Sequence, residues 1–169
     1  MKIVVHDASI LIDLAACELL GIWFGQGIEK RTTSLVWREV NRKNQKARLQ
    51  RFVDEGGLGV EPINAEAMSA VIVLHAEVES KITIEDASAL YIAEKRQAIL
   101  LTGDKGLRQY ATERGLEVHG LLWVFDSLVA RGGIIPSVAA ERLEWLASQG
   151  TCRLPKQECS QRIKKWRSL

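Results

Sequence analysis

Four carboxylates stand at positions in this chain where they could do chemistry together: Asp7, Glu39, Asp86 and Asp104. Asp7 comes directly after an uncharged β-branched run and Asp104 follows a second apolar run, so both are expected at the ends of buried strands. Four anions cannot stay close together and ionised without a counterion, because like charges raise one another's pKa. Oxygen ligands without histidine or cysteine select hard cations such as Mg²⁺ or Mn²⁺, and such a site is suited to phosphodiester hydrolysis.

Each of these acids also has a plainer structural explanation. Asp7 and Asp104 both precede an apolar helical pattern, where a short polar side chain is a good N-cap. Asp86 completes the capping-box pattern that begins at Thr83, yet it shares a helix face with small and apolar residues that are expected to face the sheet. Glu39 lies at the edge of an apolar helix face, where a lone glutamate is usually solvated. Convergence on one place would separate a metal site from unconnected caps and surface charges.

The hydropathy pattern predicts elements that could bring these acids together. Strands are expected at residues 3–5, 31–33, 58–63, 97–102 and 116–118. Helices are expected at residues 10–20, 34–55, 64–80, 83–96, 104–114, 120–130 and 136–149. Strands and helices alternate with short links, which indicates right-handed βαβ crossovers and a parallel sheet that is covered on both faces.

This pattern predicts an α/β protein with a three-layer α/β/α arrangement around a central parallel sheet. One domain is expected over residues 1–150. Residues 151–169 are expected to form a polar, basic C-terminal tail, which packs on the domain or on a partner through Ile163 and Trp166.

The composition is that of an ordinary globular protein: 169 residues, 47% hydrophobic and 26% charged. The net charge of +2 neither requires nor excludes a nucleic-acid partner. The three cysteines do not form a disulfide framework, so we expect reduced thiols in a cytoplasmic protein. The longest apolar run, residues 70–74, is too short to cross a bilayer, so no membrane partner is expected.

Four segments carry a family resemblance, in order along the chain: HDASILIDL, LVWREV, ITIEDASALYIA and LLTGDKGL. Together they resemble the acidic motifs of the PIN-domain family, and the similarity covers about residues 1–133. The resemblance implies a parallel α/β/α fold and Mg²⁺- or Mn²⁺-dependent cleavage of single-stranded or structured RNA. In bacteria many such proteins are toxins that a co-expressed antitoxin holds inactive.

The resemblance also implies roles for individual residues. His119 and Gly120 stand where members of the family often have a further acid or amide, so an additional ligand is not expected there. An RNA substrate, an antitoxin partner and a homo-oligomer, namely a dimer, are expected. By motif match, the catalytic and metal-binding quartet is Asp7, Glu39, Asp86 and Asp104, and the supporting hydroxyls belong to Ser9 and Thr102.

Residues 38–51 form a notably basic part of the second expected helix. Cations there could steer RNA phosphates toward the acids, and the candidate RNA-binding residues are Arg38, Arg42, Lys43 and Lys46. A solvated helix face would have the same composition, so both interpretations stay open. Trp37 is the one tryptophan considered for stacking on a base, although packing in the core is favoured.

Two other functional classes are open. A non-catalytic binding module of the same fold would have no need for clustered acids. A receiver-type phosphoacceptor domain needs an acidic pair at its first strand and a lysine after its last one. Here Asp7 has no acidic neighbour, and Lys105 directly follows Asp104. We therefore predict a metal-dependent endoribonuclease, and acyl-phosphate formation with acetyl phosphate would identify the receiver alternative.

Overall fold

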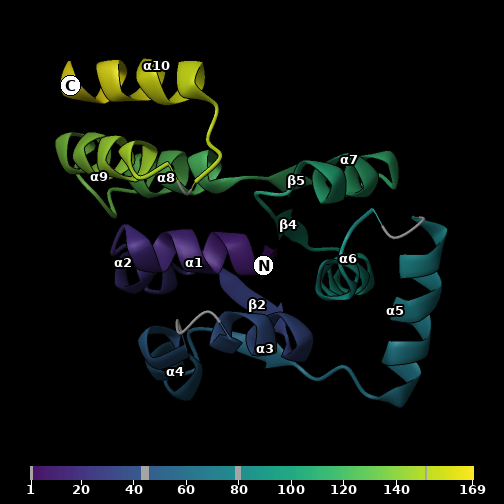
Figure 1. Cartoon of the computed structure of the whole chain (residues 1–169). Helices are drawn as coiled ribbons and strands as arrows, with labels where there is room; N and C mark the ends of the chain where they lie inside the picture. The colour runs from purple at the N-terminus through teal and green to yellow at the C-terminus, as the bar shows by residue number, and fades with distance from the viewer. Residues whose placement is uncertain (1, 43–45, 79–80, 151) are drawn as a thin grey trace.

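The computed structural model describes residues 2–42, 46–78, 81–150 and 152–169, which form a parallel five-stranded sheet between layers of helices (Figure 1). The predicted three-layer α/β/α fold is confirmed. The strand order β3-β2-β1-β4-β5 reverses direction at β1, and open α/β sheets bind their ligands at the carboxyl ends of the strands beside such a reversal. The strands are β1 (Ile3–His6), β2 (Glu29–Thr33), β3 (Gly59–Glu61), β4 (Ile99–Leu101) and β5 (Val118–His119).

The helices cover both faces of the sheet. On one face α6 lies against β1, β2 and β4 and has α5 and α7 beside it, while α1 and α8 pack together on the other face (Figure 1). Helices α9 and α10 stack beyond α8. The helix bounds are α1 (Ala8–Ala16), α2 (Leu20–Phe24), α3 (Ser34–Arg42), α4 (Lys46–Asp54), α5 (Ala65–Glu77), α6 (Ile84–Arg96), α7 (Lys105–Glu113), α8 (Leu121–Ala130), α9 (Pro136–Ser148) and α10 (Lys156–Arg167).

Strands β1 and β4 are the buried centre of the molecule. Val4, Val5, Leu100 and Leu101 have no exposed surface, because helices cover the sheet on both sides. This burial explains why the two runs contain no polar alternation. In register, Val5 is paired with Leu100 and His6 with Leu101, so the residues that follow them, Asp7 and Thr102, leave the sheet side by side.

The expectation of one basic helix over residues 34–55 is wrong, because this segment forms two helices, α3 and α4. The apolar residues of α3 pack toward α1 and α6, whereas those of α4 pack toward α2. The Phe52 ring of α4 lies 4.9 Å from the Phe24 ring of α2. A single straight helix could not pack against both sets of partners, and residues 43–45 between α3 and α4 lie outside the described residues.

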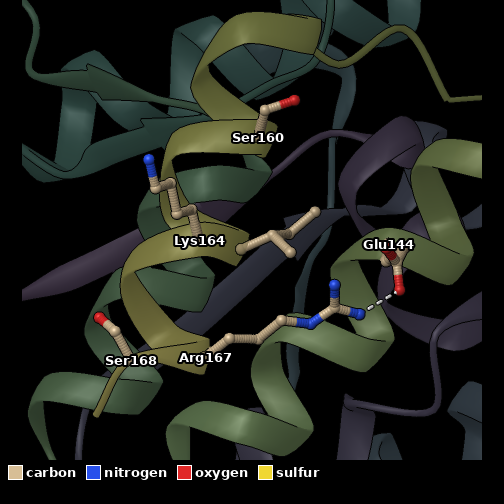
Figure 2. Close-up of a pocket in the computed structure, with 6 residues that line it drawn as sticks. Glu144, Ser160, Lys164, Arg167 and Ser168 are labelled. Carbon is tan, nitrogen blue, oxygen red and sulfur yellow. Dashed lines mark hydrogen bonds and ion pairs between the residues drawn. The ribbon is translucent and has the colours of Figure 1, made fainter.

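The C-terminal tail forms helix α10, which packs along α9 and reaches α8. Trp166 is 3% exposed, and its ring stacks with that of Phe125 in α8 at 6.2 Å. Arg162 donates to both carboxylate oxygens of Asp126, at distances of 2.8–3.0 Å. A surface pocket lies between α9 and α10, where Arg167 pairs with Glu144 at 2.5 Å (Figure 2). None of the four acids lines this pocket.

Two further expectations concern the thiols and the membrane. Cys17, Cys152 and Cys159 are free, as expected. Burial raises the pKa of the Cys17 thiol to about 12, which makes it a weak nucleophile at neutral pH. In the part of the chain that the structure describes, none of the helices combines the length and the hydropathy needed to span a bilayer.

Candidate active site

Asp7 is the centre of the candidate site, at the end of β1 and the start of α1. Its carboxylate is 2% exposed and acts as the N-cap of α1. Oδ1 accepts hydrogen bonds from the Ile10 N–H at 3.0 Å and from the Ser9 hydroxyl at 2.8 Å. Oδ2 accepts a short hydrogen bond from the Thr102 hydroxyl. Asp7 is therefore both the helix cap and the most buried of the four acids.

The two predicted hydroxyl residues both contact Asp7 and also fix the loop that follows β4. The Ser9 hydroxyl accepts from the Gly103 N–H at 3.0 Å, and the Thr102 hydroxyl accepts from the Asp104 N–H at 2.9 Å. A Cβ atom at residue 103 would lie 2.9 Å from Ser9 Oγ, so a side chain there would displace the serine. Ser9 and Thr102 thus tie the end of β1 to the end of β4.

The surroundings of Asp7 disfavour its ionised form. Burial is the largest cause and raises the pKa of Asp7 to about 6, although its three hydrogen bonds oppose the rise. The negative charge of Asp86 raises this pKa further. A carboxylate held in this way would be stabilised by a nearby cation.

Asp104 and Asp86 each begin a helix, as the capping explanation proposed. Asp104 Oδ1 accepts from the Leu107 N–H at 2.7 Å and caps α7. Asp86 and Thr83 form a complete capping box on α6, because each side chain accepts from the other's backbone N–H, at 3.1 and 3.0 Å. The capping hydrogen bonds go to Asp86 Oδ2 and Asp104 Oδ1, so each cap uses one of the two carboxylate oxygens.

Asp86 and Asp7 are nevertheless affected by the charges of other acids, which isolated caps would not be. Burial raises the pKa of Asp86, and the charges of Asp104 and Glu39 raise it further. Since Asp86 also raises the pKa of Asp7, it links all four carboxylates. Glu39 reaches this group from α3, which packs against α6.

One pair of residues that the sequence did not single out positions Asp86. The Thr33 hydroxyl at the end of β2 and the Ser88 hydroxyl of α6 are 2.6 Å apart, and both residues are fully buried. Thr33 Oγ1 also accepts from the Val36 N–H at 3.1 Å, so it holds the start of α3 as well. This contact joins the helices that carry Glu39 and Asp86. A threonine at the end of a predicted strand was the only sequence feature that could have suggested this contact. Its partner, Ser88, lies 55 residues away, so the sequence did not identify the pair.

His6, the last residue of β1, is a structural residue. Its Nε2 accepts from the Trp23 indole N–H at 2.8 Å, and its Nδ1 lies 3.0 Å from the Arg31 carbonyl. Burial lowers the pKa of His6 to about 4, so the ring is neutral at neutral pH. His119 stacks on Trp123 at 4.6 Å and contacts Glu117 at 2.9 Å.

The basic residues proposed for RNA binding are only partly described. Arg38 is exposed on α3 and Lys46 is exposed at the start of α4. Lys43 and the side chain of Arg42 lie outside the described residues. Trp37 is half-buried against the core, which is the packing explanation favoured for it.

The donors fit a hard divalent cation by their chemistry, since all are carboxylate oxygens around the buried Asp7. As the side chains lie, no three acidic, histidine or cysteine side chains among the described residues are arranged to hold a metal ion.

Comparison with known proteins agrees with this architecture. A family model described as a PIN domain matches residues 3–168. The crystal structure of PAE2754 from Pyrobaculum aerophilum superposes with a TM-score of 0.57 at 21% identity, covering 76% of this chain and 98% of that one. A PilT N-terminus domain protein, SSO1118 from Sulfolobus solfataricus P2, gives a TM-score of 0.52 at 16% identity, covering 75% and 92%. At these identities the likeness shows the fold alone. No curated protein sequence gave a significant match.

Proposed function

Because the chain belongs to the PIN domain family, we propose that it is a metal-dependent ribonuclease that hydrolyses RNA phosphodiester bonds. Proteins of this family are generally nucleases, commonly dependent on a divalent metal. The observation that carries the proposal is the meeting of Asp7 and Asp104 at the carboxyl ends of β1 and β4, where Ser9 and Thr102 tie the two loops together and the charge of Asp86 raises the pKa of Asp7. A binding module without catalysis would gain nothing from a buried carboxylate whose neighbours are also acidic.

The four acids are the residues that would hold Mg²⁺ or Mn²⁺. A bound divalent cation supplies Lewis-acid activation of a phosphodiester oxygen and of an attacking water. Asp7 is held in one orientation by three hydrogen bonds, two of which come from the hydroxyls of Ser9 and Thr102. Fixing the ligand beforehand means that binding a cation costs little side-chain entropy.

The test is an RNA cleavage assay with purified protein in Mn²⁺, in Mg²⁺ and in excess chelator. Wild type is expected to cut with metal and to stop with chelator. Asp7→Asn and Asp104→Asn are expected to lose at least about 100-fold in rate, because each removes a charged ligand. The matched control is Asp54→Asn, which removes one exposed carboxylate from α4. Cleavage that survives both site substitutions would point to a contaminating nuclease or a different site.

We also propose that the protein acts as a toxin, that an antitoxin protein binds it, that it forms a dimer and that it is cytoplasmic. Growth arrest on expression of wild type, absent with Asp7→Asn, would support the toxin role. Growth that is equal for both would speak against it.

A further inference from the structure

Arg108 of α7 places a cation beside the acids, at the carboxyl ends of β4 and β5. Its Nη2 donates a hydrogen bond to the Thr102 carbonyl at 3.0 Å. The hydroxyl of the same threonine donates to Asp7 Oδ2. One residue therefore connects the guanidinium of Arg108 with the most buried carboxylate of the site.

Gly120, at the start of α8, makes room for this guanidinium. A Cβ atom at residue 120 would lie 2.6 Å from Arg108 Nη2 and 3.7 Å from its Cζ. The backbone at Gly120 has a φ of −112°, which any residue can adopt, so its conformation does not require glycine. Glycine at this position leaves free the space that the guanidinium occupies.

Among the residues that the structure describes, Arg108 has no acidic partner in an ion pair. The half-exposed guanidinium has five N–H donors and makes one hydrogen bond to the described residues, with no carboxylate within ion-pair distance among them. Arg114, six residues later at the end of the same helix, pairs with Glu94 and Glu77. The other arginines with described ion pairs are Arg31, Arg51, Arg96, Arg142, Arg162 and Arg167.

We propose that Arg108 is a positioning residue that binds a backbone phosphate of the RNA strand lying across this edge of the sheet. The proposal rests on the ribonuclease function proposed above. Clustered acids repel an approaching phosphate, and a fixed cation beside them offsets that repulsion. The planar guanidinium suits bidentate contact with phosphate oxygens, and the bond to Thr102 leaves most of its donors available.

Three variants separate this role from a structural one. Arg108→Gln removes the charge, while Gly120→Ala keeps the charge but displaces the guanidinium. The control is Arg153→Gln, which removes one exposed cation from the segment between α9 and α10. Binding of a short labelled single-stranded RNA is measured by fluorescence anisotropy, in chelator to prevent cleavage, over a range of salt concentrations.

Arg108→Gln is expected to weaken RNA binding by about 10-fold or more, the worth of a charge-assisted hydrogen bond. The slope of log K against log salt should fall in magnitude by about 0.7, which is one phosphate contact on a single strand. Gly120→Ala should likewise weaken RNA binding and reduce the salt slope, whereas both quantities should stay near the wild-type values in Arg153→Gln. The melting-temperature rise produced by Mn²⁺ should match wild type in Arg108→Gln, because Arg108 is not a metal ligand.

The outcomes distinguish this inference from the proposed function. If wild type cuts RNA but Arg108→Gln binds with an unchanged salt slope and cuts normally, the inference is overturned and the nuclease stands. If Arg108→Gln only lowers the melting temperature, with its salt slope unchanged, the residue merely anchors the Thr102 carbonyl and the inference also fails. If wild type binds RNA through Arg108 but does not cut it with any metal, the proposed function fails while the RNA contact holds.

Discussion

Replacing Asp7 by asparagine is expected to stabilise the metal-free protein at neutral pH. Moving the pKa of a carboxyl from 3.8 to about 6 corresponds to about 3 kcal/mol of lost folding stability once the group is ionised. Asparagine has nearly the same shape and carries no charge. It keeps an acceptor for the Ile10 N–H and the Ser9 hydroxyl, and it loses the hydrogen bond from Thr102, which costs about 1 kcal/mol. The net gain is about 2 kcal/mol, or about 4–8 °C in melting temperature for a chain of this size.

The stability that Asp7→Asn gains over the wild type should increase as pH rises. The folded-state pKa of Asp7 is raised, so its stabilising contribution is present below the unfolded value of 3.8 and is lost as pH rises toward about 6. At about pH 4.5 the charge of Asp7 costs the wild type about 1 kcal/mol, which cancels the hydrogen bond lost in the variant. Melting temperatures of the two proteins should therefore coincide at about pH 4.5 and separate by about pH 7.5.

Metal should reverse the order of stability at neutral pH. Mn²⁺ at about a hundredfold above its dissociation constant adds about 2.7 kcal/mol to the wild type, and the variant should gain much less because one ligand is missing. The assay is a set of melting curves, in chelator and in Mn²⁺, with Asp54→Asn as the control for an exposed carboxylate. A variant less stable than wild type in chelator at both pH values, with equal Mn²⁺ shifts, would show that Asp7 is only a helix cap.

Three other predictions concern the surroundings of the site and the tail. Thr102→Val should raise the pKa of Asp7 further, because its hydroxyl stabilises the carboxylate, so Mn²⁺ titrations should find half-maximal binding at higher pH; an unchanged midpoint would contradict this. Trp166→Ala should lower the free energy of unfolding by about 3–5 kcal/mol in urea titrations, since its ring is buried between helices, and a loss under about 1 kcal/mol would mean that α10 is not docked. Replacing Arg38 and Lys46 together by alanine should reduce the salt dependence of RNA binding by one to two phosphate contacts, whereas an unchanged slope would leave both as solvated surface.

The sequence alone was sufficient to predict the fold and the positions of Asp7 and Asp104 at the ends of buried strands. The uncharged runs that became β1 and β4 are completely buried, and their lack of polar alternation follows directly from a sheet covered on both faces. Asp7 and Asp104 were placed at strand ends because an acid there interrupts an apolar run just before a helical pattern. Local patterns of this kind involve neighbouring residues, so they can be interpreted without knowing the tertiary structure.

Tertiary structure decided which contacts form between distant segments. Asp86 completes a capping box and is also near enough to Asp104 and Glu39 for their charges to raise its pKa, so its capping role does not separate it from the other acids. The division of residues 34–55 into α3 and α4 followed from partners elsewhere in the chain, α6 and α2. The Thr33–Ser88 contact likewise spans 55 residues and has no local signature.

Arg108 and Gly120 show most clearly the difference between what the sequence determines and what the tertiary structure decides. In the sequence Arg108 is one basic residue on the polar side of a helix, and Gly120 is a small residue that follows a short strand. Folding places them in contact at the ends of β4 and β5, because both strands run parallel and finish at the same edge. The sequence determined which residues could carry charge, whereas only the parallel packing of the strands decided which charges meet.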